Sequence, residues 1–174
     1  EQLEHWRAVL TLNNSDYFLL EFPHDLVFPG SKEYLFDLVS AGFTPIICHP
    51  ERNLVFQQHP RLLYRLLQVG VLAQLDAGSI RGDFGQTAYD TAMILLGHNL
   101  IHVIASDCHD TRINPPGLSF IYKRLHEIEK EKIDLLVEKV PLAIVNNNAL
   151  PDTGPLQDPT RKTTFFDLFR RSTC

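Results

Sequence analysis

Four side chains with metal-binding chemistry follow short apolar runs of the sequence, at the point where each run ends. Glu21 ends the first run, His49 follows the second, and Asp107 and His109 follow the last. Carboxylate oxygens and imidazole nitrogens form a ligand set that suits zinc, manganese or iron. In an extended chain Asp107 and His109 are two residues apart and point the same way, so both would reach one metal cluster. These four residues are therefore predicted metal ligands.

Each of these residues also has a purely structural interpretation. An Asp-x-His pair occurs often by chance, His49 before a proline is suited to ending a strand, and Glu21 before a Phe-Pro pair is suited to a surface ion pair. Ligand sites of α/β proteins are built at the carboxyl ends of strands. The recurrence of these residues at successive strand ends therefore favours the metal site.

An arginine lies three residues after the second candidate ligand. The planar guanidinium of Arg52 is well suited to gripping two oxygens of a phosphate group. An ordinary surface arginine paired with Glu51 is equally compatible with the sequence. Both interpretations are open at this point.

The other histidines and the cysteines fit structural roles better. His102 lies within an apolar run, and most of the rest are expected on helices or at the surface. His24 stays a minor candidate because it lies three residues past the first predicted ligand. Cys48 and Cys108 are expected to be buried and inert, and a Cys108–His109 nucleophile pair is disfavoured because neighbours on a strand face apart.

Positioning these side chains requires regular elements, and the sequence alternates two kinds. Short β-rich runs, typical of buried parallel strands, cover residues 17–21, 44–48, 71–76 and 101–105. Amphipathic helical patterns cover residues 31–41, 60–70, 86–96, 121–128 and 132–140. Such alternation predicts an α/β fold with a parallel sheet or barrel.

Individual residues indicate where the predicted helices begin and end. Ser31 is predicted to cap the first helix, which would bury Tyr34 and Leu35 and stop at Gly42. Pro60 is well suited to the first turn of the second helix. No internal repeat and no second domain are detected.

The composition narrows the class of protein. The chain has 174 residues, a formal charge of −5, 44% hydrophobic and 21% charged residues, which excludes a disordered or collagen-like chain. Its mild acidity disfavours a nucleic-acid partner. No apolar run approaches the roughly 18 residues of a transmembrane segment, and the N-terminus carries no signal pattern. Three widely spaced cysteines fit a reducing cytosol.

Four motifs carry a resemblance to a known family, and they agree with it in order and spacing. They are Leu-Leu-Glu-Phe-Pro at 19–23, Gly-Phe-Thr-Pro-Ile-Ile-Cys-His-Pro-Glu-Arg-Asn at 42–53, Asp-Ala-Gly-Ser-Ile-Arg-Gly-Asp-Phe-Gly at 76–85 and Leu-Ile-His-Val-Ile-Ala-Ser-Asp-Cys-His-Asp at 100–110. The sequence resembles the bacterial PHP-type protein-tyrosine phosphatases, manganese-dependent enzymes of capsular and exopolysaccharide synthesis within the polymerase-and-histidinol-phosphatase superfamily. The similarity covers nearly all of residues 1–150.

The resemblance implies a fold and a cofactor. The chain would be the C-terminal portion of a distorted (β/α)7 TIM-like PHP barrel, with residues 1–150 in the barrel and residues 151–174 as a C-terminal tail. The family holds up to three metal ions, Mn²⁺ above all, with Fe or Zn as alternatives. Its opening His-x-His strand is absent here, and Met93 is the only methionine. The chain is therefore expected to be a piece of a longer protein, or a processed one.

The resemblance also assigns roles to individual residues. It implies Glu21 as the carboxylate that bridges two metals, with His49, Asp107 and His109 as further ligands. Arg52 is implied as the catalytic residue that binds the substrate phosphate, and Ser79 as a second substrate-binding residue.

The reaction that follows from the resemblance is hydrolysis of protein phosphotyrosine in the cytoplasm, on a bacterial tyrosine kinase that regulates polysaccharide synthesis. Two alternatives remain: a small-molecule phosphatase of the histidinol-phosphate type, and a catalytically silent fragment or binding module that lacks half of the metal ligands. The aromatic and basic residues at 165–171 would form either a short interfacial helix or a tail that packs on the barrel or is disordered.

Overall fold

A computed structural model of the chain describes residues 7–109, 117–126, 128 and 130–160. Its centre is a sheet of four parallel strands in the order β1-β2-β3-β4. The strands are β1 (Tyr17–Leu20), β2 (Thr44–Cys48), β3 (Leu72–Asp76) and β4 (Val103–Ala105). All four lie within the predicted runs, so the α/β fold with a parallel sheet is confirmed.

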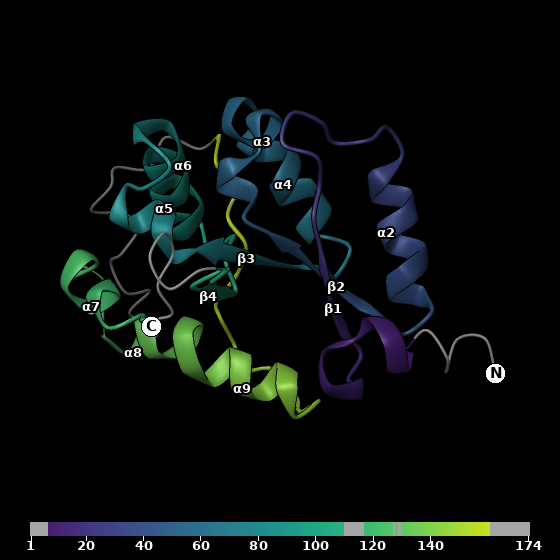
Figure 1. Ribbon diagram of the computed structural model, residues 1–174. Helices are drawn as coiled ribbons and strands as arrows, with labels where there is room; N and C mark the ends of the chain where they lie inside the picture. Colours follow the sequence, from purple (N-terminus) through teal and green to yellow (C-terminus); the bar gives the residue numbers. More distant parts are fainter. Residues whose placement is uncertain (1–6, 110–116, 127, 129, 161–174) are drawn as a thin grey trace.

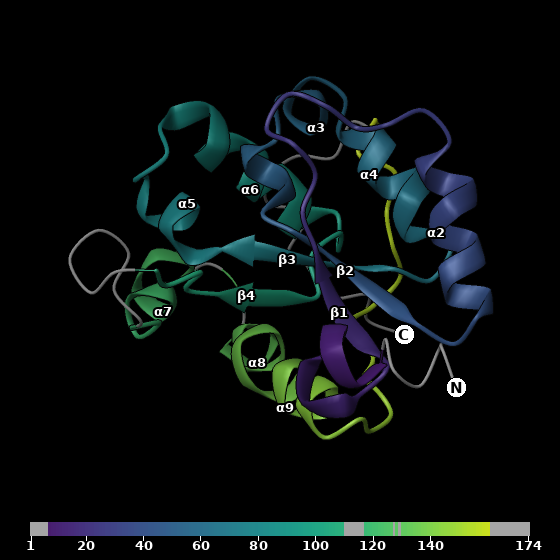
Figure 2. The same ribbon diagram turned by 45° about the vertical axis from the view of Figure 1, so that its right-hand side comes forward.

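Helices cover both faces of this sheet (Figure 1). One face carries α2 (Ser31–Ser40), α3 (Leu54–Gln58), α4 (Pro60–Leu67) and α6 (Gln86–Gly97). The opposite face carries α8 (Lys130–Asp134), the π-helical stretch η3 (Leu135–Lys139), α9 (Val140–Val145) and the short 3₁₀ helix η1 (Leu12–Asn14). Figure 2 shows the same two layers from another side, with α5 (Ala77–Arg81) and α7 (Phe120–Arg124) beside the β4 edge.

Two hydrophobic clusters follow from the alternation of side chains along each strand. Ile47 of β2 and Leu75 of β3 point into the larger cluster, which the buried leucines of α4 and α6 complete. Ile46 of β2 points the other way and packs with Val140 and Ile144 of α9. Because both faces are covered, the strands are mostly apolar, as parallel strands usually are, and the polar residues of β3, Gln74 and Asp76, are buried as well.

Several predicted helix details are corrected. Gly30, with φ of +80°, occupies the N-cap position of α2, and Ser31 is the first helical residue. Tyr34 is 67% exposed rather than buried, so the apolar stripe of α2 is narrower than its sequence suggests. Pro60 does begin α4, as predicted, with Gly70 (φ +98°) shortly beyond its end.

The short helices were not predicted. The five-residue α3 and α5 and the 3₁₀ helix η2 (Pro50–Arg52) all lie directly after strands or in tight turns. The helix predicted over 132–140 is instead an α-to-π-to-α succession that continues to Val145. Among the described residues, no helix is long and apolar enough to cross a membrane.

Candidate functional site

The parallel sheet brings four strand ends to one edge, and charged side chains meet there in two groups. In the first group, His49 Nε2 lies 3.2 Å from Glu21 Oε1. In the second, Nη1 of Arg52 lies 3.0 Å from Asp76 Oδ2 and 3.4 Å from Asp107 Oδ2. The structure therefore pairs two of the predicted ligands with each other and brings a third, Asp107, to the predicted phosphate-binding arginine.

His49 sits at a sharp change of backbone direction. Its N–H continues the ladder between β2 and β3 by donating to the carbonyl of Gln74 at 2.8 Å. Its own φ and ψ, 34° and 53°, are left-handed, a conformation that costs a non-glycine residue free energy and is concentrated at functional sites. The turn ends the strand at once and starts η2, which carries Arg52 to the same edge.

Asp107 is the second non-glycine residue with left-handed backbone at a strand end, with φ of 47°. The segment after β4 is therefore not extended. Asp107 and His109 do not point the same way through strand geometry, as an extended chain would require. The ring Nδ1 of His109 instead lies 2.8 Å from the backbone carbonyl of Asp107. That contact leaves Nε2 as the nitrogen able to bind a metal.

Arg52 is oriented by more than its two carboxylate contacts. Its Cζ lies 4.1 Å from the centre of the Phe84 ring, so the guanidinium is placed over an aromatic face. The side chain is 32% exposed. The alternative in which Arg52 pairs with Glu51 at the surface is wrong, because Glu51 is fully buried and Arg52 contacts other acids.

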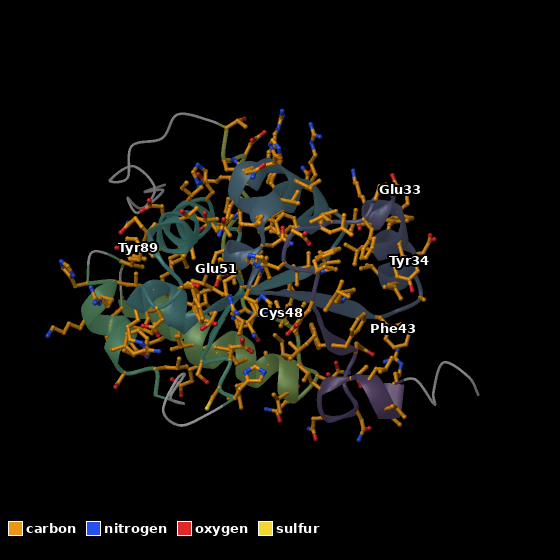
Figure 3. All side chains as sticks on the ribbon, turned by 45° about the horizontal axis from the view of Figure 1, so that its top comes forward. Glu33, Tyr34, Phe43, Cys48, Glu51 and Tyr89 are labelled. Atoms are coloured by element: carbon orange, nitrogen blue, oxygen red, sulfur yellow. The ribbon has the colours of Figure 1, made fainter. Side chains whose placement is uncertain are left out.

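Glu51 is a buried carboxyl that the sequence did not single out. Its Oε1 accepts hydrogen bonds from the Ser79 hydroxyl at 2.6 Å and from the Asp76 N–H at 3.2 Å, whereas Oε2 is buried without a partner. Burial raises the pKa of Glu51 to about 8. Figure 3 shows Glu51 and Cys48 well inside the molecule and Tyr34 at its rim.

Ser79 and Asp76 lie close together where β3 passes directly into α5, with Asp76 at the end of the strand and Ser79 within the helix. Ser79, the predicted substrate-binding residue, is fully buried and its hydroxyl donates to Glu51. Asp76 is the N-cap of α5, since its Oδ1 accepts from the Gly78 N–H at 2.7 Å, while its Oδ2 accepts from Arg52. Burial raises the pKa of Asp76, and the hydrogen bond from Gly78 and the charge of Arg52 oppose that shift.

Asn53 is a second residue that sequence reasoning missed. Its side-chain oxygen caps α3 by accepting from Val55 and Phe56 N–H, and its Nδ2 donates to the carbonyls of Pro23 and Leu26. These bonds tie the turn that carries Arg52 to the loop that follows Glu21. An asparagine directly before an apolar run is a typical N-cap signal, and it could have been found.

One pocket of about 280 Å³ opens between these groups. Glu21, His49 and Arg52 line it together, with His24 at its side and Cys48 in its wall. Three predicted site residues therefore face one space, and the minor candidate His24 lies next to it.

The cysteines behave differently from each other. Cys48 is buried as predicted, and burial, followed by the negative charge of Glu21, raises the pKa of its thiol to about 12. Such a thiol stays protonated and is a poor nucleophile. The prediction for Cys108 is wrong, because Cys108 is exposed in the turn that follows β4.

His102, predicted to be structural, is buried and accepts the Ala73 N–H on its Nδ1 at 3.2 Å.

The donor chemistry of the first group fits a metal. Two donors that are each about 2.1 Å from one ion lie roughly 3 to 3.4 Å apart in tetrahedral or octahedral geometry, and the Glu21–His49 separation of 3.2 Å falls in that range. Among the described residues, no group of three or more histidine, cysteine, aspartate or glutamate side chains is arranged to hold an ion. Within this part of the chain, Glu21 and His49 thus form a pair whose spacing is compatible with two ligands of one ion.

Comparison with known proteins gives a consistent picture. Residues 1–146 match the family model described as capsular polysaccharide synthesis, CpsB/CapC. The chain is 34% identical over 164 residues to tyrosine-protein phosphatase YwqE of Bacillus subtilis (strain 168), an alignment that covers 94% of this chain and 63% of that protein. It is 32% identical over 159 residues to the putative tyrosine-protein phosphatase CapC of Staphylococcus aureus, covering 88% and 60%.

The fold comparison agrees. The structure superposes with a TM-score of 0.76 and 30% identity on a chain from the crystal structures of YwqE from Bacillus subtilis and CpsB from Streptococcus pneumoniae, described as unique metal-dependent tyrosine phosphatases. The match covers 91% of this chain and 65% of that one. The chain thus spans about three-fifths of the length of these relatives.

Proposed function

Because the chain belongs to the CpsB/CapC family of capsular polysaccharide synthesis proteins, we propose that it carries out metal-dependent hydrolysis of protein phosphotyrosine. The observation that supports this most directly is the pocket that Glu21, His49 and Arg52 share. It combines a metal-binding pair with a cation suited to phosphate. Neither feature alone distinguishes a phosphatase from other metalloproteins.

Arg52 has the free donors that phosphate binding requires. Both side-chain hydrogen bonds of Arg52 leave from Nη1, toward Asp76 and Asp107, and its Nε and Nη2 donate to no described residue. These two nitrogens present the parallel N–H pair that binds two phosphate oxygens. We therefore assign Arg52 to the neutralisation of charge on the phosphoryl oxygens in the transition state.

We propose Glu21, His49, Asp107 and His109 as metal ligands, with Mn²⁺ as the metal and up to three ions in the whole protein. A bound metal supplies an activated water at neutral pH and a Lewis acid for the phosphoryl oxygens. The tyrosine leaving group has a pKa of about 10, so its departure needs little proton assistance. No residue of the chain is assigned as a general acid, and Ser79 is retained as a substrate-binding candidate.

The proposal also covers the fold and the substrate of the whole protein. The four-stranded sheet corresponds to consecutive strands of a distorted (β/α)7 barrel, with residues 1–150 in that barrel and 151–174 as a tail. The expected substrate is a cytoplasmic tyrosine kinase that regulates capsule or exopolysaccharide synthesis. The aromatic and basic residues of the tail lie outside the described residues.

Phosphate release from a phosphotyrosine peptide, with and without Mn²⁺ and a chelator, tests the proposal. Arg52→Ala should lower kcat/KM by about a hundredfold or more, the usual cost of removing one group that stabilises the transition-state charge, and Arg52→Lys should recover only part of the loss. Arg61→Ala is the matched control, because Arg61 pairs with Asp158 away from the pocket. Circular dichroism confirms that each variant is folded.

Two results would contradict the proposal. Phosphate release that persists in chelator would show that the reaction does not need a metal. Phosphate release that is unchanged in Arg52→Ala would show that the reaction does not need this arginine. Absence of release from phosphotyrosine peptides would favour a silent binding module, and faster release from histidinol phosphate would favour the small-molecule phosphatase.

A further inference from the structure

Phe84 lies under the guanidinium of Arg52 without belonging to the hydrophobic core. The loop that carries it, between α5 and α6, is largely exposed, and Phe84 itself is half-buried. Among the described residues, Phe84 is in neither hydrophobic cluster and is not packed against either. Core packing therefore does not explain why a phenylalanine occupies this position.

The ring contacts the one side chain whose orientation the proposed reaction depends on. A distance of 4.1 Å from Arg52 Cζ to the ring centre places the cation over the aromatic face, where the quadrupole of the ring attracts it. The carboxylates of Asp76 and Asp107 hold one end of the guanidinium at Nη1. Both of these contacts are made at one nitrogen, at one end of the guanidinium, whereas the stacked ring contacts its whole face and adds a restraint on its plane.

Fixing that plane determines where the remaining donors point. With Nη1 held by the acids, Nε and Nη2 form the open edge of a side chain that lines the pocket beside Glu21 and His49. A guanidinium ordered before the substrate arrives loses less conformational entropy on binding phosphate. An arginine has several rotatable bonds, so the gain from ordering it in advance is large.

The neighbouring turn is shaped to accept the ring. A Cβ added at Gly78 would lie 2.7 Å from Phe84 Cε2, so any side chain at 78 would displace Phe84. The N–H of the same glycine donates to Asp76 Oδ1. One residue thus sets the position of both the aromatic ring and the carboxylate that hold Arg52.

From these contacts we infer that Phe84 is a positioning residue, whose ring holds the guanidinium of Arg52 in the plane needed for two-point contact with the phosphate of the substrate. The inference rests on the proposed function for the identity of the phosphate. The order it predicts for the Arg52 side chain does not depend on catalysis.

The decisive variant is Phe84→Leu, which keeps apolar bulk and removes the π face. In nuclear magnetic resonance relaxation measurements, the order parameter of the Arg52 Nε–H bond is expected to fall in Phe84→Leu and to be retained in Phe84→Tyr. Gly78→Ala, whose Cβ would displace the ring and also crowd Asp76 Oδ1 at 3.1 Å, should lower it too. Phe120→Leu is the matched control, because it removes the stack under Arg81 and not the one under Arg52.

A kinetic cycle gives the second readout. Phe84→Leu should lower kcat/KM for a phosphotyrosine peptide about three- to tenfold, the effect of losing one cation–π contact, and should have no further effect in an Arg52→Ala background. Unchanged order of Arg52 Nε–H in both Phe84→Leu and Gly78→Ala would overturn the inference. So would an equal kinetic loss with and without Arg52.

The two readouts separate the inference from the function. Loss of Arg52 order in a chain that releases no phosphate would support the positioning role while contradicting the phosphatase. If the chain releases phosphate but the order of the Arg52 side chain does not change with residue 84, the phosphatase would be supported and the positioning role contradicted.

Discussion

At the scale of single residues, the edge of the sheet is built around a fully buried acid, Glu51. Glu51 accepts two hydrogen bonds on Oε1 and leaves Oε2 buried without a partner. A buried polar atom without a partner costs free energy, and the two hydrogen bonds on Oε1 offset part of that cost. Glu51 joins η2, which ends at Arg52, to the junction of β3 and α5, where Asp76 and Ser79 lie.

Removing that acceptor should destabilise the fold. Glu51→Ala leaves two buried donors unpaired and opens a cavity, so the free energy of unfolding should fall by about 2–4 kcal/mol. Glu51→Gln keeps an acceptor of the same shape and should lose about 1 kcal/mol or less. Urea denaturation monitored by circular dichroism measures both.

Ser79→Ala serves as the control for a single bond, with an expected loss of about 1 kcal/mol. If Glu51→Ala were as stable as the wild type, the buried carboxyl would not organise the turn.

The burial of Glu51 was beyond sequence reasoning, for a physical reason. A glutamate between a proline and an arginine is compatible with a solvated surface turn, and only tertiary contact with Ser79 makes it a buried acceptor. The proximity of Glu21 to His49, and of Asp107 to Arg52, was predictable because a parallel sheet brings strand ends together. The backbone turns at His49 and Asp107, which decide where those side chains point, carry no sequence pattern.

At the scale of elements, the strands were predictable and the short helices were not. Runs such as Thr44–Cys48 and Leu72–Asp76 are mostly apolar because helices bury both faces of the sheet. The five-residue α3 and α5 are too short for a helical period to be visible. Each forms because a polar residue at the end of the preceding segment, Asn53 or Asp76, caps it.

The junction of β3 and β4 depends on a neutral histidine. Just before β4, the His102 N–H donates to the Ala73 carbonyl at 2.9 Å, and its ring Nδ1 accepts the Ala73 N–H in return. Burial lowers the pKa of His102 to about 4. A protonated ring could not accept that hydrogen bond. Both burial and the hydrogen bond from the Ala73 N–H therefore disfavour the charged form of His102.

Stability should therefore fall as the solution is acidified. Between pH 6.5 and pH 4 the unfolded chain binds a proton at this histidine and the folded chain does not, so the free energy of unfolding should decrease by up to about 3 kcal/mol from this group. His102→Asn keeps an acceptor near Nδ1 and should flatten that part of the pH profile. Thermal or urea denaturation between pH 4 and pH 7 measures the difference.

His126→Asn, at an exposed position, should leave the slope of the pH profile close to that of the wild type. A His102→Asn profile as steep as the wild-type profile would show that this histidine does not control the acid sensitivity.

At the scale of the whole molecule, the described sheet is open, with β1 and β4 at its edges. Its site lies at the carboxyl end, and the chain spans about three-fifths of the length of its tyrosine-phosphatase relatives. The described residues supply the Glu21–His49 pair proposed to bind metal and the arginine, Arg52, proposed to bind phosphate. A larger metal cluster needs further donors close to this pair, which makes the pair itself the feature to test.

The most direct test is a crystal structure of the chain grown with Mn²⁺ and phosphate, with data collected at the manganese absorption edge. We expect an anomalous peak about 2.0–2.2 Å from a Glu21 carboxylate oxygen and from His49 Nε2. Phosphate oxygens should lie on the Nε–Nη2 edge of Arg52. A crystal with no manganese at the Glu21–His49 pair, or with phosphate bound away from Arg52, would contradict the assignment of this edge as a metal-dependent phosphatase site.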